Sequence, residues 1–246
     1  MYRTSNPALN DSTFTIQDLV QEKMTIQGVA EKGFIALGVM LITGLSVFGL
    51  FVTGNLELAM MLSIVGWGVG LIFFFVMILT GLSDNPIAIL TYAALQGLFL
   101  GGLTTMFEAL YPGIAIQAFV LTAGVFGTML VIYRMGLIPV NDNTRIILAS
   151  AMGGVFIIYM LTFILSFAGI SIPFIHGSGP IGILFSLFVI GLGAYCLACD
   201  FDFIENGVEN GAPKSYEWRA VFGLLVTLVW IYLEMLRLLA KLQSRR

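Results

Sequence analysis

Long apolar runs recur along the chain from about residue 34 almost to its C-terminal end. A helix of about 20 apolar residues crosses the roughly 30 Å hydrocarbon core of a bilayer. Hydrophobic residues make up 59% of the chain and charged residues only 10%, whereas a soluble domain carries about a quarter charged residues. The sequence therefore predicts an all-α integral membrane protein that crosses the membrane several times.

Seven candidate spans are predicted, and short polar connections with turn residues join most of them. The spans cover residues 34–53, 58–80, 86–107, 114–133, 146–170, 180–199 and 219–240. Tight connections make sequential spans antiparallel neighbours, so residues 34–246 are predicted to form one seven-helix bundle. Residues 1–33 are predicted to form a polar cytoplasmic arm, in which 16–32 fit either a short amphipathic helix on the membrane surface or a solvated segment.

The seventh span is the least regular, because it contains Glu234 and Arg237 and its apolar stretch before Glu234 is short. Two interpretations follow. The last helix is central and the other helices shield its charges from lipid, or the protein has six spans and a re-entrant or interfacial C-terminal segment.

Lysine and arginine positions predict that the N-terminus is cytoplasmic, since cytoplasmic loops are enriched in basic residues. With that orientation, every basic residue before the last span lies on the inner side: Arg3, Lys23, Lys32, Arg134, Arg145, Lys214 and Arg219. A seventh crossing then places a basic tail at the outer face, against the rule. This tail (Arg237, Lys241, Arg245 and Arg246) is the main argument for six spans.

Asp200 and Glu234 are the main candidates for functional residues, because ionisable side chains within membrane spans are rare and mark functional sites. Asp200 ends an apolar run that begins at Pro180. Burial in a poorly solvated bundle favours the neutral form of a carboxyl group, and a second acid nearby couples the two titrations. Such groups can bind a cation when ionised and release it on protonation. The competing interpretations are a water-facing helix end for Asp200 and an i,i+3 ion pair with Arg237 for Glu234.

Asp202, Glu205 and Glu209 follow on one side of a continued helix and are predicted to form a solvated vestibule that attracts cations. The stretch "DFDFIENGVENG" does not fit an EF-hand loop, because Ile204 and Glu205 occupy positions that need an oxygen ligand and a glycine. Asp84 lies at a span end, where an interfacial role is expected.

Other motifs predict packing rather than chemistry. Gly97 and Gly101 form a GxxxG pattern that favours close helix packing inside the bundle. Cys196 and Cys199 form a CxxC in an apolar run, which supplies too few ligands for a zinc site and is predicted to pack as apolar side chains. No nucleophile elbow, phosphate loop or HExxH is present. We therefore expect no enzyme activity, no cofactor and no metal site, and the net charge of -3 argues against a nucleic-acid partner.

Several stretches resemble the Bax-inhibitor family, also called the transmembrane Bax inhibitor motif family, and in particular its bacterial branch. They are "DFDFI" near the end of span 6, "IYLEMLRLLAKL" in the last helix, "NPIAILTYAALQGLFLGG" in span 3 and "IQAFVLTAGVFG" in span 4. The similarity extends over nearly the whole chain from about residue 34. It implies seven helices with the last one central, and a pH-sensitive calcium leak channel or transporter gated by a hydrogen-bonded aspartate pair.

Within that resemblance, Asp200 matches the first aspartate of the family pattern, while Phe201 and Asp202 replace its threonine and glutamine. The partner on the last helix depends on the register. Matching "IYLE" makes it Glu234, whereas matching "LRLL" makes it Thr227, which has no carboxylate. At 1.5 Å per residue from a turn near residues 210–213, Thr227 lies closer to the depth of Asp200, so the Thr227 register is favoured and Glu234 is treated as an independent buried acid.

The sequence thus predicts a pH-sensitive cation channel or transporter for Ca2+, or one coupled to H+, in the inner membrane of a bacterium. Asp200 is predicted to be its protonation-sensitive gate, and the bilayer its principal partner. The rival hypothesis is a regulatory protein that conducts no ions and binds a membrane protease or a stress-response complex.

Overall fold

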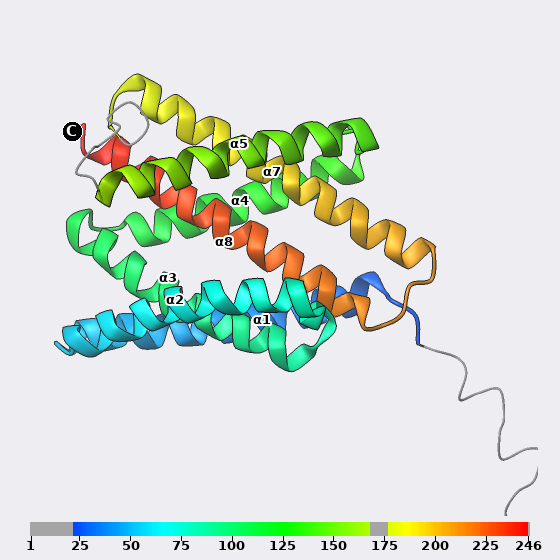
Figure 1. The fold of residues 1–246 in the computed structure, drawn as a ribbon, viewed down its shortest axis with the longest axis horizontal. Helices are drawn as coiled ribbons and strands as arrows, with labels where there is room; N and C mark the ends of the chain where they lie inside the picture. The colour runs from blue at the N-terminus through cyan, green and yellow to red at the C-terminus, as the bar shows by residue number, and fades with distance from the viewer. Residues whose placement is uncertain (1–21, 168–176, 246) are drawn as a thin grey trace, which may run out of the picture.

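The computed structural model describes residues 22–167 and 177–245 of the chain (Figure 1). Within these residues, seven helices are long and apolar enough to cross a membrane. They are α1 (Ile26–Val52), α2 (Leu56–Thr80), α3 (Pro86–Leu110), α4 (Ile114–Arg134), α5 (Asp142–Phe167), α7 (Pro180–Glu209) and α8 (Tyr216–Gln243), with a short 3-10 helix η2 (Leu82–Asp84) between α2 and α3. The predicted seven-helix membrane bundle is confirmed.

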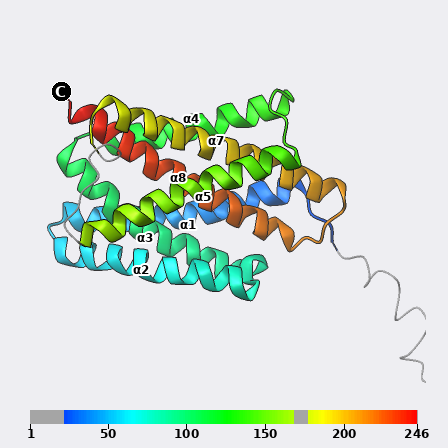
Figure 2. The same cartoon turned by 45° about the horizontal axis from the view of Figure 1, so that its top comes forward.

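Helix α8 runs through the middle of the bundle, between a group formed by α1, α2 and α3 and a group formed by α4, α5 and α7 (Figures 1 and 2). It packs against α1, α3, α4 and α7. Val221, Phe222 and Leu225 in its first half join an apolar cluster with α1–α3. Ile231 and Leu236 in its second half join a separate cluster with α4 and α7. The last helix is therefore central.

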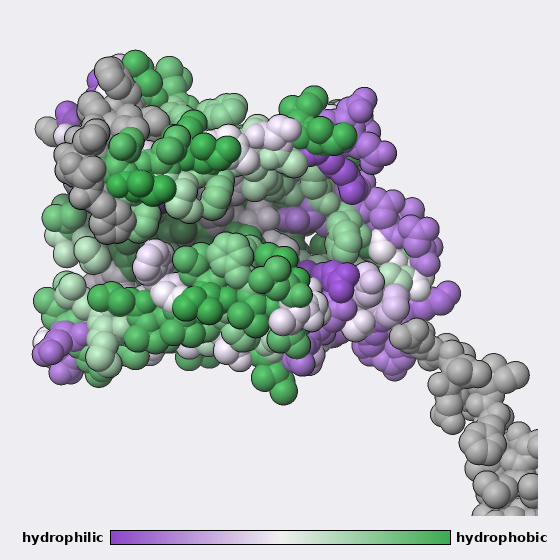
Figure 3. All heavy atoms as spheres, in the orientation of Figure 1, coloured by the Kyte–Doolittle hydropathy of each residue, from purple (hydrophilic) through white to green (hydrophobic). Residues whose placement is uncertain are grey.

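The six-span alternative is wrong, because α8 is one continuous helix from Tyr216 to Gln243. The surrounding helices cover Glu234, whose side chain is only 1% exposed. The outward-facing side chains of the bundle are largely hydrophobic, and hydrophilic side chains gather at the end where α7 stops and α8 begins (Figure 3). We call this the proximal end and the opposite one the distal end.

Helix α1 begins at Ile26, before the predicted span start at residue 34. The Thr25 hydroxyl caps the helix by accepting a hydrogen bond from the Gly28 backbone N–H at 2.9 Å. Residues 26–33 of the predicted polar arm are thus the first turns of a membrane helix. Of the segment 16–32, for which an amphipathic surface helix was one hypothesis, residues 16–21 lie outside the described residues and residues 26–32 belong to α1.

The segment just before α1 is paired with the connection between α7 and α8. The Met24 N–H donates to the Ala212 carbonyl and the Lys214 N–H donates to the Glu22 carbonyl, both at 2.8 Å. A hydrogen bond from the Lys214 ammonium also lowers the pKa of the Glu22 carboxyl below its usual value. The buried Glu217 carboxylate completes the junction by accepting from the Thr25 N–H at 2.8 Å. The segment before α1 is therefore joined directly to the α7–α8 connection at the proximal end.

The GxxxG pattern of α3 packs inside the bundle, as predicted. A Cβ added at Gly97 would lie 1.9 Å from the Thr43 hydroxyl of α1, and one added at Gly101 would lie 2.5 Å from the Gly44 carbonyl oxygen. Side chains at either glycine would force α1 and α3 apart. These glycines therefore set the close contact between α1 and α3.

Candidate functional site

Asp200 lies on α7 and faces α8, where Thr227 is its partner. The Thr227 hydroxyl donates a hydrogen bond to Asp200 Oδ2 at 2.7 Å. The same hydroxyl also lies 3.1 Å from the carbonyl oxygen of Gly223, one turn earlier on α8. Asp200 is nine residues before the end of α7 and Thr227 eleven after the start of α8, or about 14 and 17 Å along the two antiparallel helices. The hydrogen bond places Thr227 opposite Asp200, where the favoured register puts it. Asp200 therefore faces a neutral hydroxyl group.

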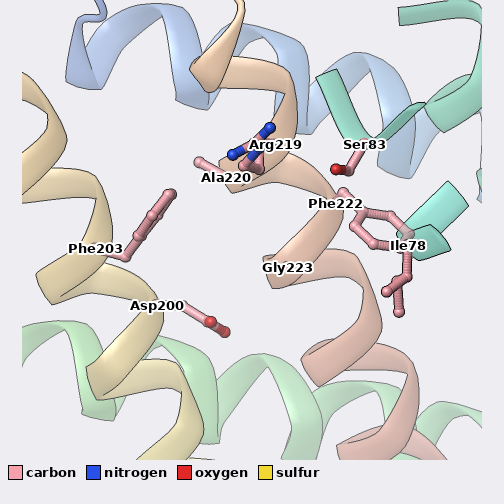
Figure 4. Close-up of a pocket in the computed structure, with 8 residues that line it drawn as sticks. All are labelled: Ile78, Ser83, Asp200, Phe203, Arg219, Ala220, Phe222 and Gly223. Carbon is pink, nitrogen blue, oxygen red and sulfur yellow. The ribbon is translucent and has the colours of Figure 1, made fainter. Parts of the chain in front are cut away.

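A cavity of about 350 Å³ opens beside Asp200. Figure 4 shows the Asp200 side chain pointing from α7 toward α8, with Gly223 on the facing helix. A Cβ added at Gly223 would lie 3.6 Å from Asp200 Oδ1, so the missing side chain leaves open the space next to the carboxylate. Side chains from α2, η2, α7 and α8 line the cavity: Ile78, Ser83, Asp200, Phe203, Arg219, Ala220, Phe222 and Gly223.

Arg219 brings a positive charge to the same cavity, and Asp84 neutralises it. The guanidinium donates to both carboxylate oxygens of Asp84, at 2.5 and 2.8 Å, and lies over the Tyr216 ring with 4.4 Å to its centroid. Two parallel N–H donors to one carboxylate fix the orientation of the arginine. Arg219 therefore ties α8 to η2, and among the described residues Asp200 has no ion-pair partner.

The predicted vestibule acids point away from this cavity. Asp202 pairs with Arg145 of α5, and Glu205 accepts a hydrogen bond from the Tyr133 hydroxyl of α4 at 2.5 Å. Each residue turns a helix by about 100°, so Asp202 lies on nearly the opposite side of α7 from Asp200. Glu209 ends α7 at the proximal surface. The three acids lie near the proximal end, as a vestibule requires, but none of them lines the cavity that reaches Asp200.

Glu234 forms a second buried acidic site, separate from the first. Its Oε1 accepts from Arg237 Nη1 at 2.6 Å and from the Tyr159 hydroxyl of α5 at 2.9 Å. The other carboxylate oxygen, Oε2, is buried without a hydrogen-bond partner among the described residues. Glu234 lies seven residues beyond Thr227 on α8, or about 10 Å further along. The predicted i,i+3 pair with Arg237 is confirmed, and Glu234 does not face Asp200.

Sequence reasoning missed the roles of Arg219 and Gly223 and gave Asp84 only an interfacial one. One signal was available for the charged pair, because Asp84 and Arg219 lie at span ends on the same side of the predicted topology. No local pattern indicated that they would meet, since they are 135 positions apart. Gly223 carried no signal, because its importance comes only from the carboxylate on the facing helix.

The chemistry available at this site is that of one carboxylate beside a cavity within a membrane bundle. Such a group can hold a proton or attract a cation. No group of three histidine, cysteine, aspartate or glutamate side chains in the described ranges is placed to hold a metal ion. The site thus offers a single titratable ligand.

Comparison with known proteins gives one match. A family model described as Bax inhibitor 1 like matches residues 6–244, nearly the whole chain. No curated protein matches the chain, and no solved structure does.

Proposed function

The chain belongs to the Bax inhibitor 1 like family, and on this premise we propose that it is a pH-sensitive cation channel or transporter, with Ca2+ as its cation. One observation carries the proposal: the Asp200 carboxylate borders a cavity of about 350 Å³, and the Thr227 hydroxyl is its only hydrogen-bond partner within residues 22–167 and 177–245. A buried carboxylate without a compensating cation is costly, and such groups within membrane helices serve transport.

The proposed gate works through the charge of Asp200. When ionised, Asp200 attracts a cation into the cavity, while the Thr227 hydroxyl holds one of its carboxylate oxygens in place. Protonation removes that charge and turns Asp200 into a hydrogen-bond donor. The Arg219–Asp84 pair assists because the Asp84 carboxylate offsets the guanidinium charge that would otherwise repel a cation.

Cations would reach the site from the proximal end. There Asp202, Glu205 and Glu209 add negative charge near the end of α7, although Asp202 is paired with Arg145. Acidic residues around a pore mouth raise the local cation concentration. In a bacterial inner membrane with the N-terminus inside, this end would face the cytoplasm.

The test is Ca2+ flux into liposomes that carry the purified protein, followed with an enclosed calcium-sensitive dye at a series of pH values. Wild type should conduct Ca2+ with a rate that changes with pH. Asp200→Asn keeps the shape of the side chain but cannot ionise, so its flux should be low and independent of pH. The matched control is Asp142→Asn at the exposed start of α5, which should behave as wild type. Equal pH responses in wild type and Asp200→Asn would refute the gate.

A second candidate is the regulatory protein that conducts no ions and binds a membrane protease or stress-response complex. The observation that favours it is the neutral Thr227 opposite Asp200, where the family pattern has a second aspartate. Flux no greater than that of empty liposomes, together with a defined partner captured by crosslinking in cells, would support this function over the channel.

A further inference from the structure

Sulfur atoms gather where α5 crosses α7, in the helical turn of α7 that precedes Asp200; neither Cys196 nor Cys199 lines the cavity beside Asp200. Cys196 Sγ lies 3.0 Å from Met152 Sδ of α5. Cys196 is 8% exposed, and Cys199 one turn later is partly buried; both are free cysteines. Direct contact between a thiol and a thioether from two different helices goes beyond the simple packing predicted for the CxxC.

The register of the two helices places Cys199 in the same seam. The α5–α7 pair is antiparallel, and it is fixed at two points: Met152 contacts Cys196, and Arg145 pairs with Asp202. Cys199 lies three residues from both Cys196 and Asp202, and residues three apart share a helix face. Cys199 therefore faces α5 between these two contacts, within electrostatic reach of Arg145.

The sulfur donor atoms determine which class of metal ion this place could bind. Two thiols and a thioether are soft ligands, which favour Cu(I) over hard cations. A structural zinc site would need four tetrahedral ligands, and the described residues offer no third histidine, cysteine or carboxylate at this place. Methionine adapts readily because its side chain has three rotatable bonds, so Met152 can turn to admit an ion between the sulfur atoms.

We propose that Cys196, Cys199 and Met152 bind one Cu(I) ion between α5 and α7. Binding releases one proton from each thiol, forms two Cu–thiolate bonds and one Cu–thioether bond, and leaves the oxidation state of copper unchanged. The bound unit, one Cu(I) with two thiolates, carries a net charge of minus one. Arg145 lies within electrostatic reach of this position, as do Asp200 and Asp202, and Arg145 is paired with Asp202. The site does not depend on ion flux through the Asp200 cavity.

The test is an anaerobic titration of the purified full-length protein in lipid nanodiscs with the coloured Cu(I)–bicinchoninate complex, with loss of colour reporting transfer. Wild type should remove one Cu(I) per chain. Cys196→Ser/Cys199→Ser should remove none, and Met152→Leu should bind at least about tenfold more weakly, the scale of loss seen even for outer-shell changes around metals. The matched control is Met160→Leu, an exposed methionine on the same helix, which should bind as wild type.

Three results would contradict the proposal that these residues bind Cu(I). They are no transfer to wild type beyond empty nanodiscs, unchanged binding in the double cysteine variant, or equal affinities for Met152→Leu and Met160→Leu. Because the cysteine variant could misfold, X-ray absorption of the Cu(I)-loaded wild type provides a measurement without mutation. It should show only sulfur neighbours around copper, and nitrogen or oxygen in the first shell would contradict the proposed ligands.

Discussion

Asp200 and Glu234 are both carboxylates at the α8 interfaces, yet their surroundings differ in kind. Asp200 borders a cavity and has a neutral hydroxyl as its partner. Glu234 is enclosed, with a guanidinium and a phenol on the same carboxylate oxygen. The first group is uncompensated and has room beside it, whereas the second is compensated and closely packed.

This difference separates a candidate functional acid from a structural one. A buried charge that is paired and hydrogen-bonded can be kept at little net cost, while an unpaired one must gain a proton, water or a cation. Glu234 joins α5 to α8 through Tyr159. Asp200 has no such structural bond to a charged group in the described part of the chain, so its charge is available to respond to pH or to an ion.

The largest effect should come from filling the cavity beside Asp200. Gly223→Leu places an apolar side chain in the cavity next to the carboxylate, where its Cβ alone would lie 3.6 Å from Asp200 Oδ1. Flux in the liposome assay should fall to the level of empty vesicles. Gly191→Leu on α7 is the matched control, because a Cβ there meets open space, and its flux should equal that of wild type. Normal flux through Gly223→Leu would show that this cavity is not the pathway.

The next largest effect should be on the free energy of unfolding, through the buried carboxylate of Glu234. Arg237→Ala removes the guanidinium that is hydrogen-bonded to the buried Glu234 carboxylate, and should lower the free energy of unfolding by about 2 kcal/mol. This is less than the roughly 3–5 kcal/mol for breaking a fully buried pair, because the Arg237 side chain is 44% exposed. Equilibrium unfolding in mixed micelles measures the change.

A double variant provides the control for that prediction. Glu234→Gln/Arg237→Ala also removes the buried carboxylate charge and should recover part of the lost free energy of unfolding. The pH response of flux should equal that of wild type in both Arg237→Ala and the double variant. A changed pH response in Arg237→Ala alone would mean that the two acids are coupled.

The smallest expected effect tests the neutral partner of Asp200. Thr227→Asp adds a second carboxylate facing the first, which should raise Ca2+ flux several-fold at neutral to alkaline pH by increasing the negative potential in the cavity. The two facing acids should then titrate as a pair, so the pH response should broaden. Thr227→Val keeps the shape without the charge and should not raise flux. Equal flux in the Asp and Val variants would contradict the electrostatic basis of the gate.

Much of the fold could be predicted from the sequence, because long apolar runs indicate the number and order of the membrane spans. The rise per residue was also enough to place Thr227 opposite Asp200. The start of α1 could not be predicted in the same way. Its first turns are polar, and they are held in place by the Thr25 cap and by contacts with a connection nearly 190 residues away, such as the hydrogen bond to Ala212.

The candidate site was predictable only in part. Asp200 was identifiable as an acid at the end of an apolar run. Asp202 and Glu205, however, were predicted to line a vestibule leading to Asp200 only because they follow it closely along the chain. Their direction around α7 was decided by partners on other helices, Arg145 and Tyr133. Pairing between distant helices, as for Arg219 and Asp84, leaves no local pattern in a single sequence.

The central position of α8 has a consequence for how the protein is made. The helix that contacts α1, α3, α4 and α7 follows all of them in the chain and is therefore synthesised after them, and chains generally begin to fold from their N-terminal side during synthesis. The earlier helices must therefore wait in the bilayer with their inner faces open, held by contacts such as that between α1 and α3. They gain their central partner only when α8 inserts among them and residues 22–24 pair with residues 212–214.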